Sequence, residues 1–441
     1  MMQVLEVREF EKIIEANEKN QNLKRFDKQY QCLDKKTFHE FLEFIHEFEQ
    51  KEENSDILNF ITIGYKKVLG QTITFKNYVG LIQLKKNVQI QILPKIAFLK
   101  EEKDETKKVF LKMLRSMKDF SGKTAANANL NPENMNLYEI FINLYIQEVR
   151  RLVKNGIKSS YLNQEENLNV YKGKLLVNEH LKQNIVHKER FYVVFDEYQA
   201  NCPQNRLIKS TLLKLQQLTG SAQNSKEIRQ LLVSFELVEP SKNYEKDFSK
   251  VVIDRTTKCY EVLLKWSKVF LKNKSFSMFS GTESARALLF PMEKVFEAYV
   301  AKNLKKRLNQ AGWDVSIQDK GYYLFDTLNG EKYQKFALRP DLVITRPDES
   351  IIILDTKWKS LINNKKANYG ISQADMYQMY AYAKKYQASE VWLLYPMNEE
   401  MRNTEPILFD SGDGVRVSVF LVDVAQIEES LEKLFLAFAS K

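Results

Sequence analysis

Apolar residues recur along the chain at two different spacings, and the spacing changes several times. Residues 1–55 are charged, with apolar positions at helical spacing in KTFHEFLEFIHEFEQ, which predicts amphipathic helix. Within residues 57–98, QTITFKNYVGLIQL and NVQIQILPKI predict strands, and KKN between them predicts a turn. Helical spacing returns over residues 104–118 and in NPENMNLYEIFINLYIQEVRRLVKNG, where Gly156 predicts the end of the helix.

The second half repeats this change of period. A mixed segment leads into residues 205–275, which predict mostly helix, and the polar stretch KNKSFSMFSGTES marks a domain boundary. LLFPMEKVFEAYVAKNLKKRLNQAG then predicts a helix with Pro291 in its first turn and Gly312 at its end. Four strand-like segments follow, then a basic loop, the helix around ADMYQMYAYA, and the strands EVWLLYP and VRVSVFLVD. This order predicts a central mixed sheet flanked by helices.

The fold class is therefore α+β and multidomain. The pattern divides the chain into a mixed α/β region at residues 1–130, a mostly helical region at 131–280 and the sheet-and-helix region at 281–441. The length of 441 residues, 44% of them hydrophobic, is enough for two or three domains with their own cores.

Composition narrows the class of protein. The net charge of +10 suits a polyanionic partner such as nucleic acid, although a lysine-rich solvated surface would give the same balance. The three cysteines form no CxxC pair and the four histidines no HExxH motif, so the sequence predicts no structural zinc site or disulfide framework. We expect a cytoplasmic protein without a membrane partner, because the amino terminus lacks a signal peptide and no apolar run approaches a membrane span.

SGKT at Ser121–Thr124 resembles the end of a phosphate-binding P-loop. That motif needs a glycine five residues before Gly122, where Met117 stands, and a preceding strand, where VFLKMLRSMKDF predicts helix. We therefore expect another chain to supply any nucleotide hydrolysis.

The candidate chemistry lies in RPDLVITRPDESIIILDTKWK, residues 339–359. If this hairpin is symmetric about Asp348, Asp341 faces Asp355, and directly opposed residues have Cβ atoms about 4.5–5.5 Å apart. Lys357 lies two residues beyond Asp355 and shares its face of the strand. Aspartate is a poor strand former, so two carboxylates and an ammonium on one patch indicate function.

Two close carboxylates repel each other unless a divalent cation lies between them. Mg²⁺, for which Mn²⁺ can substitute, favours carboxylates, waters and phosphate oxygens, so the patch predicts metal-assisted phosphodiester hydrolysis. Lys357 would position a water or stabilise the phosphate in the transition state. The alternative is an exposed hairpin with a cross-strand ion pair.

Helical residues on either side add candidates. Glu293 lies within the apolar arc of the helix that begins near Pro291, and Glu297 lies at the edge of that arc. Each glutamate needs a partner, which a neighbouring lysine could also provide. Downstream, Gln378 and Tyr382 are four residues apart and share a helix face.

These residues together resemble the PD-(D/E)XK nuclease superfamily, and within it the McrC family, the nuclease subunit of McrBC-type modification-dependent restriction systems. The likeness rests on FPMEKVFEAYV, RPDLVI, LDTKWK and ADMYQMYAYA, with VYKGKL and FDEYQANCPQNRLIK in the middle of the chain. It covers residues 130–400 well and the first 130 loosely.

The resemblance implies a role for each residue. Asp341 and Asp355 would bind the metal, Lys357 would be the catalytic lysine, and Glu297 matches the helical acid better than Glu293 does. Gln378 and Tyr382 would support the site or contact DNA. Trp358 alternates with this face, so we expect it in the core.

The resemblance also implies partners: double-stranded DNA and a McrB-like hexameric AAA+ GTPase, on which the chain docks and whose hydrolysis it stimulates. The amino-terminal region at 1–130, with the middle of the chain, would form the docking part. Lys172–Lys174 and Asn205 with Arg206 are docking candidates, although a basic turn and a helix cap explain them equally well.

Two functions from different classes remain at this stage. One is a Mg²⁺-dependent endonuclease that cuts DNA under the control of a partner NTPase. The other is a non-cleaving adaptor that activates such a partner, with the acidic hairpin as a structural feature. A nuclease of another branch, acting on RNA or single strands, is a further enzyme alternative.

Overall fold

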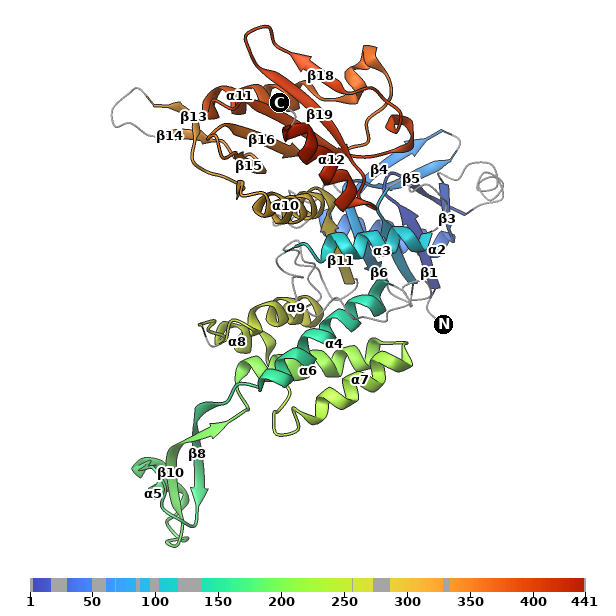
Figure 1. The fold of residues 1–441 in the computed structure, drawn as a ribbon. Coiled ribbons are helices and arrows are strands. Elements are labelled where there is room, and N and C mark those ends of the chain that lie inside the picture. Colours follow the sequence, from blue (N-terminus) through green and yellow to red (C-terminus); the bar gives the residue numbers. More distant parts are fainter. Residues whose placement is uncertain are drawn as a thin grey trace. The chain divides into compact units, whose positions relative to one another are not determined.

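The computed structural model of the chain describes residues 3–16, 30–49, 61–67, 69–84, 88–95, 103–117, 137–255, 257–272, 286–327 and 334–439. The chain divides into two compact units (Figure 1): Met1–Ser121 together with Ser284–Lys441, and Gly122–Glu283. The sequence pattern separates residues 1–130 from 281–441, whereas residues 1–121 and 284–441 belong to one unit. The mixed α+β, multidomain class is confirmed.

The amino-terminal part of the first unit contains two four-stranded sheets. In order across the first sheet, the strands are β1 (Gln3–Arg8), β7 (Val88–Leu93), β6 (Tyr78–Gln83) and β11 (Arg286–Pro291). Across the second they are β3 (Tyr30–Leu33), β2 (Lys12–Glu15), β5 (Gly70–Phe75) and β4 (Ile61–Lys66). The helices are α2 (Lys35–Glu49) and α3 (Lys103–Leu114).

The prediction of helix over residues 1–55 is wrong for three segments. Only α2 is helical among the described residues of that range, and β1, β2 and β3 are strands of four to six residues. Strands this short carry too few apolar positions to show a period, and β1 and β2 find partners in β7 and β5, far along the chain. The KKN turn and SGKT lie outside the described residues.

Strand β11 explains why the two ends of the chain share a unit. It pairs antiparallel with β6 through Leu289↔Gly80, and the chain then continues into α10 (Met292–Gln310). Gly80 has φ +143°, and a Cβ there would lie 1.9 Å from the carbonyl oxygen of Leu288. Glycine therefore permits a backbone approach that any side chain would block.

The carboxyl-terminal part contains a six-stranded mixed sheet. Its order is β12 (Asp314–Ile317), β15 (Leu342–Thr345), β16 (Ile351–Thr356), β17 (Glu390–Pro396), β19 (Arg416–Val422) and β18 (Ile407–Asp410). β16, β17 and β19 are parallel, and the other neighbours are antiparallel. The predicted strands β12, β15, β16, β17 and β19 are confirmed, while the sequence pattern missed β18 and the helix α12 (Ile427–Ala439).

Helices cover both faces of this sheet. α11 (Gln373–Tyr386) packs Met379 and Tyr382 against Ile353 and Leu393 on one face. On the other face Trp392 packs on Phe438 of α12, and α10 packs against α12 and β16. Strands β13 (Tyr323–Asp326) and β14 (Gln334–Ala337) form a separate pair.

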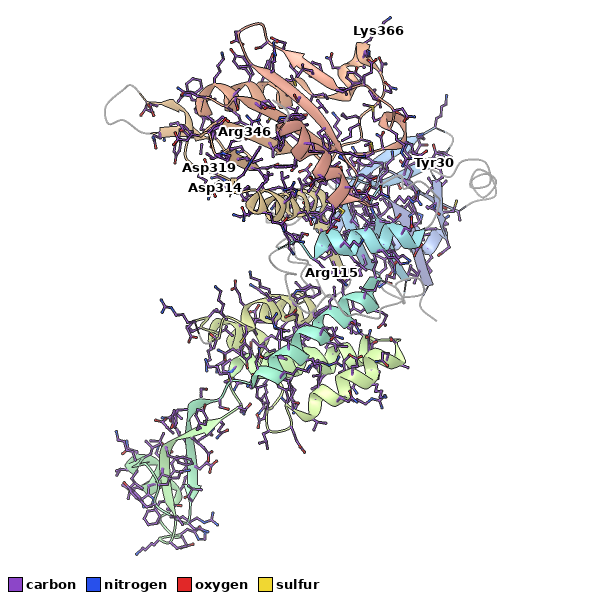
Figure 2. All side chains as sticks on the ribbon, in the orientation of Figure 1. Tyr30, Arg115, Asp314, Asp319, Arg346 and Lys366 are labelled. Carbon is purple, nitrogen blue, oxygen red and sulfur yellow. The ribbon has the colours of Figure 1, made fainter. Side chains whose placement is uncertain are left out.

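Arg346 joins several of these elements at the end of β15 (Figure 2). Its guanidinium donates to the Glu390 carboxylate at the start of β17 and to the Phe438 carbonyl oxygen in α12. Charge-assisted bonds of this kind are stronger than neutral ones, so the sheet end is held firmly.

The second unit is a group of helices that carries a hairpin. The helices are α4 (Leu137–Asn155), α6 (Pro203–Leu218), α7 (Ala222–Val233), α8 (Tyr244–Ser249) and α9 (Tyr260–Lys272). Tyr145, at 1% exposed, lies in their core, and its hydroxyl lies 2.8 Å from Ser267 Oγ. The antiparallel hairpin of β8 (Ser160–Leu168) and β10 (Phe191–Gln199), with β9 (Lys174–Leu175) and α5 (Val177–Gln183), extends from these helices (Figure 1).

No helix in the described part of the chain is both long enough and apolar enough to cross a membrane.

Candidate active site

The hairpin β15–β16 has the predicted register. Leu342 pairs with Leu354 and Val343 with Ile353, so Asp341, immediately before β15, lies opposite Asp355 in β16. Asp355 follows Ile353 by two residues and therefore shares the sheet face that α11 covers. The pairing thus brings two carboxylates from segments 14 residues apart to the edge of a helix-covered face.

Asp341 is fixed by its neighbour across the hairpin. Its Oδ2 accepts hydrogen bonds from the Thr356 backbone N at 2.7 Å and from Thr356 Oγ1 at 2.6 Å. Burial raises the pKa of Asp341 even though these bonds and Lys357 oppose that effect.

Asp355 is the most buried carboxylate of the group, at 2% exposed. Burial, followed by the charge of Asp341, raises the pKa of Asp355 to about 7. Its Oδ2 lies 2.8 Å from Lys357 Nζ, which is an ion-pair distance, but the buried oxygen has no aligned hydrogen bond among the described residues. This oxygen is the strongest candidate ligand for a cation, because a buried carboxylate oxygen should have a partner.

Lys357 lies among several acceptors. Its Nζ donates to Gln378 Oε1 at 3.0 Å and lies 3.9 Å from Asp375 Oδ1. Burial alone would lower the pKa of Lys357, yet Asp355 and the other carboxylates raise it above its ordinary value. The side chain is therefore an ammonium whose position is set by both β16 and α11.

Two residues of α11, Gln378 and Tyr382, support Lys357 through hydrogen bonds. Gln378 Nε2 donates to the Tyr382 hydroxyl at 2.7 Å, so the two residues share a helix face as predicted. Tyr382 is buried, and burial followed by the charge of Asp355 raises its pKa to about 12. The tyrosine holds the glutamine, and the glutamine holds the lysine.

The two helical glutamates have different surroundings in the structure. Glu293 is exposed, and its Oε1 accepts a hydrogen bond from Asn77 Nδ2 at 3.2 Å. Glu297 is half-buried and accepts from Gln318 Nε2 at 2.8 Å. Burial, then the nearby charge of Asp341, raises the pKa of Glu297 to about 7. Both glutamates line the cavity, but Glu297 is the one on which the charge of Asp341 acts.

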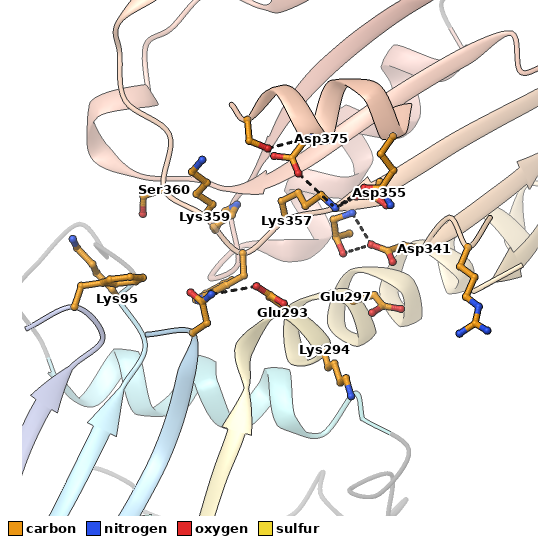
Figure 3. A pocket seen from close by; sticks show the side chains of 18 residues that line it. Lys95, Glu293, Lys294, Glu297, Asp341, Asp355, Lys357, Lys359, Ser360 and Asp375 are labelled. Atoms are coloured by element: carbon orange, nitrogen blue, oxygen red, sulfur yellow. Dashed lines mark hydrogen bonds and ion pairs between the residues drawn. The ribbon is translucent and has the colours of Figure 1, made fainter. Parts of the chain in front are cut away.

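A cavity of about 880 Å³ unites these residues. Its lining includes Gln378 and, labelled in Figure 3, Asp341, Asp355, Lys357 and Glu297. Tyr382 is not part of the lining, but its hydroxyl accepts a hydrogen bond from Gln378. Exposed cations occupy other parts of the lining: Lys95, Lys294, Arg339 and Lys359. The cavity therefore has acidic residues at its centre and basic residues around them.

Sequence reasoning missed three residues here. Asp375, which lies 3.9 Å from Lys357, sits in the first turn of α11, where an acid also favours the helix dipole and gives no separate signal. Thr356 lies inside the DTK stretch, but the sequence does not show its two hydrogen bonds to Asp341. Glu9 accepts from Trp358 Nε1 at 3.2 Å, a contact across 349 positions that no local pattern contains. Trp358 itself is buried, as predicted.

The donor set limits which metal could bind. In the described part of the chain, no three Asp, Glu, His or Cys side chains are close enough to form a metal-binding group. Two carboxylates, one with a buried oxygen that makes no aligned hydrogen bond among the described residues, fit Mg²⁺, which keeps several waters and shares substrate phosphates rather than requiring a full protein cage.

The docking candidates from the sequence lie in the second unit and differ in how exposed they are. Asn205 is buried and donates to the Lys158 and Ala200 carbonyl oxygens, and Arg206 pairs with Asp247 at 2.6 Å. These two residues hold the unit together and do not present a surface. Lys172 is exposed, and its Nζ lies 3.8 Å from the centroid of the Phe195 ring.

Comparisons with known proteins give the family and the fold of the chain. The family described as McrBC 5-methylcytosine restriction system component matches residues 73–396. A solved half-complex from the tetradecameric assembly of Thermococcus gammatolerans McrB AAA+ hexamers with bound McrC is 17% identical, with a TM-score of 0.65 over 99% of this chain and 100% of that chain, and shows a shared fold. The cryo-EM structure of the Thermococcus gammatolerans McrBC complex is 22% identical, with a TM-score of 0.45 over 69% of this chain and 88% of that chain. No curated protein matches.

Proposed function

Because the chain belongs to the McrBC family of 5-methylcytosine restriction system components, we propose that it is the DNA-cleaving subunit of such a system. Its substrate would be double-stranded DNA, and its partner a McrB-like AAA+ GTPase hexamer whose hydrolysis it stimulates. The observation that carries the proposal is the convergence of Asp341, Asp355 and Lys357 in one cavity, supported from α11 by Gln378. Under this proposal the sheet and its helices form a PD-(D/E)XK nuclease core.

Each residue has a task that follows from its contacts. Asp341 and Asp355 would hold Mg²⁺, which when bound supplies positive charge on the phosphodiester and a more acidic water. Lys357 donates to the phosphate oxygen on which charge develops, or orients the attacking water, because its ammonium is fixed between Asp355 and Gln378. Glu297 accepts a hydrogen bond from a water at the rim of the site.

Docking is proposed from the second unit. Exposed apolar side chains gather on the β8–β10 hairpin and its connections: Tyr161, Val170, Tyr171, Val177, Leu181, Ile185, Val186 and Tyr198. Exposed apolar side chains concentrated on one element mark interaction sites in soluble proteins. We assign this surface to the AAA+ partner, because the solved relative of the same fold is McrC bound to McrB hexamers. The assignment of docking to residues 1–130 stays a prediction.

The proposal is tested by metal binding and cleavage together. Calorimetric titration with Mg²⁺ or Mn²⁺ should show binding to the wild type that is tighter with a short DNA duplex. Binding should be lost in Asp355→Ala and retained in Asp348→Asn, a matched exposed aspartate in the turn of the same hairpin. Plasmid cleavage with the partner and its nucleotide should follow the same order.

Two results would contradict it. Equal metal binding by wild type and Asp355→Ala would remove Asp355 from the site. A wild type that stimulates the partner's hydrolysis but never cleaves DNA would establish the non-cleaving adaptor, with a structural hairpin.

A further inference from the structure

Three residues from the amino-terminal part of the unit line the same cavity as the candidate active site. They are Phe10, in the turn between β1 and β2, Asn77, between β5 and β6, and Lys95, two residues after β7. In the view of Figure 3, Lys95 lies at the opposite end of the drawn pocket from Asp355, with Ser360 and Lys359 between them. The cavity is thus a composite of the nuclease-like core and the amino-terminal part of the same unit.

This wall is held in place by backbone bonds. The Phe10 backbone N donates to the Phe75 carbonyl oxygen and the Glu9 N to that of Leu93, both at 2.9 Å. The buried carboxylate of Glu9 accepts from the Lys95 backbone N at 3.1 Å and from Trp358 Nε1 at 3.2 Å. Trp358 directly follows Lys357, so the wall has a fixed position relative to the proposed catalytic lysine.

The side chain of Phe10 is not buried in the hydrophobic core. Its side chain is 41% exposed, and its φ is +67°, a conformation that bulky L residues rarely adopt. Strained, exposed residues of this kind are concentrated at ligand sites. Lys95 Nζ lies 5.5 Å from the centroid of the Phe10 ring, and none of the ion pairs among the described residues involves Lys95.

We propose that Phe10 and Lys95 form a nucleic-acid contact subsite that continues the active-site cavity. Lys95 binds a backbone phosphate of the DNA strand that lies in the site, and the Phe10 ring stacks on the adjoining nucleotide. An aromatic face beside a cation is the arrangement with which proteins hold a nucleic-acid strand. The subsite rests on the proposed nuclease function, and it gives the amino-terminal region a role in substrate binding.

The test measures DNA binding by the full chain, using fluorescence anisotropy with a short phosphorothioate duplex and the matching single strand, both resistant to cleavage. Affinity is measured over a series of salt concentrations. Lys95→Gln should weaken binding and reduce the slope of log affinity against log salt by about 0.9 for the duplex, the value for one lost phosphate contact. The matched control is Lys385→Gln, an exposed lysine of α11 outside the cavity lining, which should leave the slope unchanged.

Phe10 is tested by two variants that separate the ring from the backbone. Phe10→Gly removes the ring at a positive φ that glycine adopts without strain, so the chain should fold normally. Binding should weaken by at least about fivefold, the lower end for loss of one stacked base, with no change of slope. Phe10→Trp should restore the affinity.

The failure of this inference and the failure of the proposed function are distinguishable. If the wild type binds and cleaves DNA but Lys95→Gln and Phe10→Gly bind as well as Lys385→Gln, the subsite is overturned and the nuclease stands. If Asp355→Ala retains cleavage, the proposed function fails whatever the binding series shows. A wild type that binds neither probe overturns the subsite as well.

Discussion

Glu9 is a carboxylate with no exposed surface, held between two parts of the first unit. Burial raises its pKa to about 7, although the Lys95 backbone N and Trp358 Nε1 both donate to it and Lys95 adds a favourable charge. A raised carboxyl pKa means that the folded protein binds a proton at pH values where the unfolded chain has already released it. Glu9 therefore makes stability depend on pH.

The sign of this dependence follows from linkage. Below the ordinary pKa of 4.5 the Glu9 carboxyl is protonated in both the folded and the unfolded state, so its ionisation does not affect folding stability. As pH rises from there through 7, folding stability is lost, because the charged form is favoured only in the unfolded chain. Glu9→Gln mimics the protonated acid, so we expect it to raise the free energy of unfolding at pH 8 by roughly 1–3 kcal/mol.

Urea denaturation at pH 5 and pH 8 measures this effect. The difference between wild type and Glu9→Gln should shrink at pH 5. A stability gain of Glu9→Gln that is equal at both pH values would contradict a raised pKa at Glu9.

At the level of single residues, the sequence was informative where a local rule connects positions. Hairpin symmetry placed Asp341 opposite Asp355, and strand alternation put Lys357 beside them. Helical spacing paired Gln378 with Tyr382. The rules say nothing about Glu9 and Trp358, whose contact depends on how two sheets pack. Helical spacing also placed Glu293 within the apolar arc and Glu297 at its edge, yet Glu293 is exposed and Glu297 is the half-buried one near Asp341.

At the level of elements, the pairing of β6 with β11 joins the amino-terminal sheet to the carboxyl-terminal part of the unit. Gly80 is at its closest point, and a Cβ there would meet the Leu288 carbonyl oxygen at 1.9 Å. Gly80→Ala should therefore lower the free energy of unfolding by roughly 3 kcal/mol or more, through overpacking and backbone strain together. A thermal melt of the full chain measures the loss.

Gly70→Ala is the matched control. Gly70 also has a positive φ, of +76°, but nothing lies within 4 Å of its missing Cβ. Gly70→Ala should lower the free energy of unfolding only through backbone strain, by about 1–2 kcal/mol. If the two variants lose the same stability, the close approach of β11 to β6 is not what requires glycine at position 80.

Elements were predictable in proportion to their length. The periods of α4 and α10, each 19 residues long, identify them without ambiguity, and their apolar faces are buried. β2 and β3 have four residues each, which is too short for a period, and their pairing with each other and with β5 decides their conformation. β11 was missed for the same reason, because LLFP before α10 is strand only through its partner β6.

At the level of the whole molecule, the chain leaves the first unit after Ser121 and returns to it at Ser284. Sequence patterns follow the chain in order and cannot show that its two ends share a unit. Under the proposed function, the insertion of a separate unit would allow partner docking and DNA cleavage to use different surfaces. Side chains on the β8–β10 hairpin can then be changed without touching the carboxylates of the cavity.

Ile185 and Val186 test this separation. They are 71% and 83% exposed between α5 and β10, so replacing both with serine removes apolar contact surface without emptying a core. Exposed substitutions usually change the free energy of unfolding by no more than about 0.5 kcal/mol, so the melting temperature should hold. Metal binding at Asp355 should also persist. Affinity for the AAA+ partner should fall by at least about fivefold, the loss expected when an interface anchor worth about 1 kcal/mol is removed, and stimulated nucleotide hydrolysis should fall with it.

Leu237→Ser controls for the general loss of exposed apolar surface. Leu237 is 89% exposed in the same unit, but it lies after α7, outside the hairpin and its connections. Pull-down and GTPase assays on the three proteins distinguish the outcomes. If Leu237→Ser weakens the complex as much as the hairpin variant, docking is spread over the helical surface. If neither variant weakens it, the docking surface lies in the first unit, where the prediction for residues 1–130 places it.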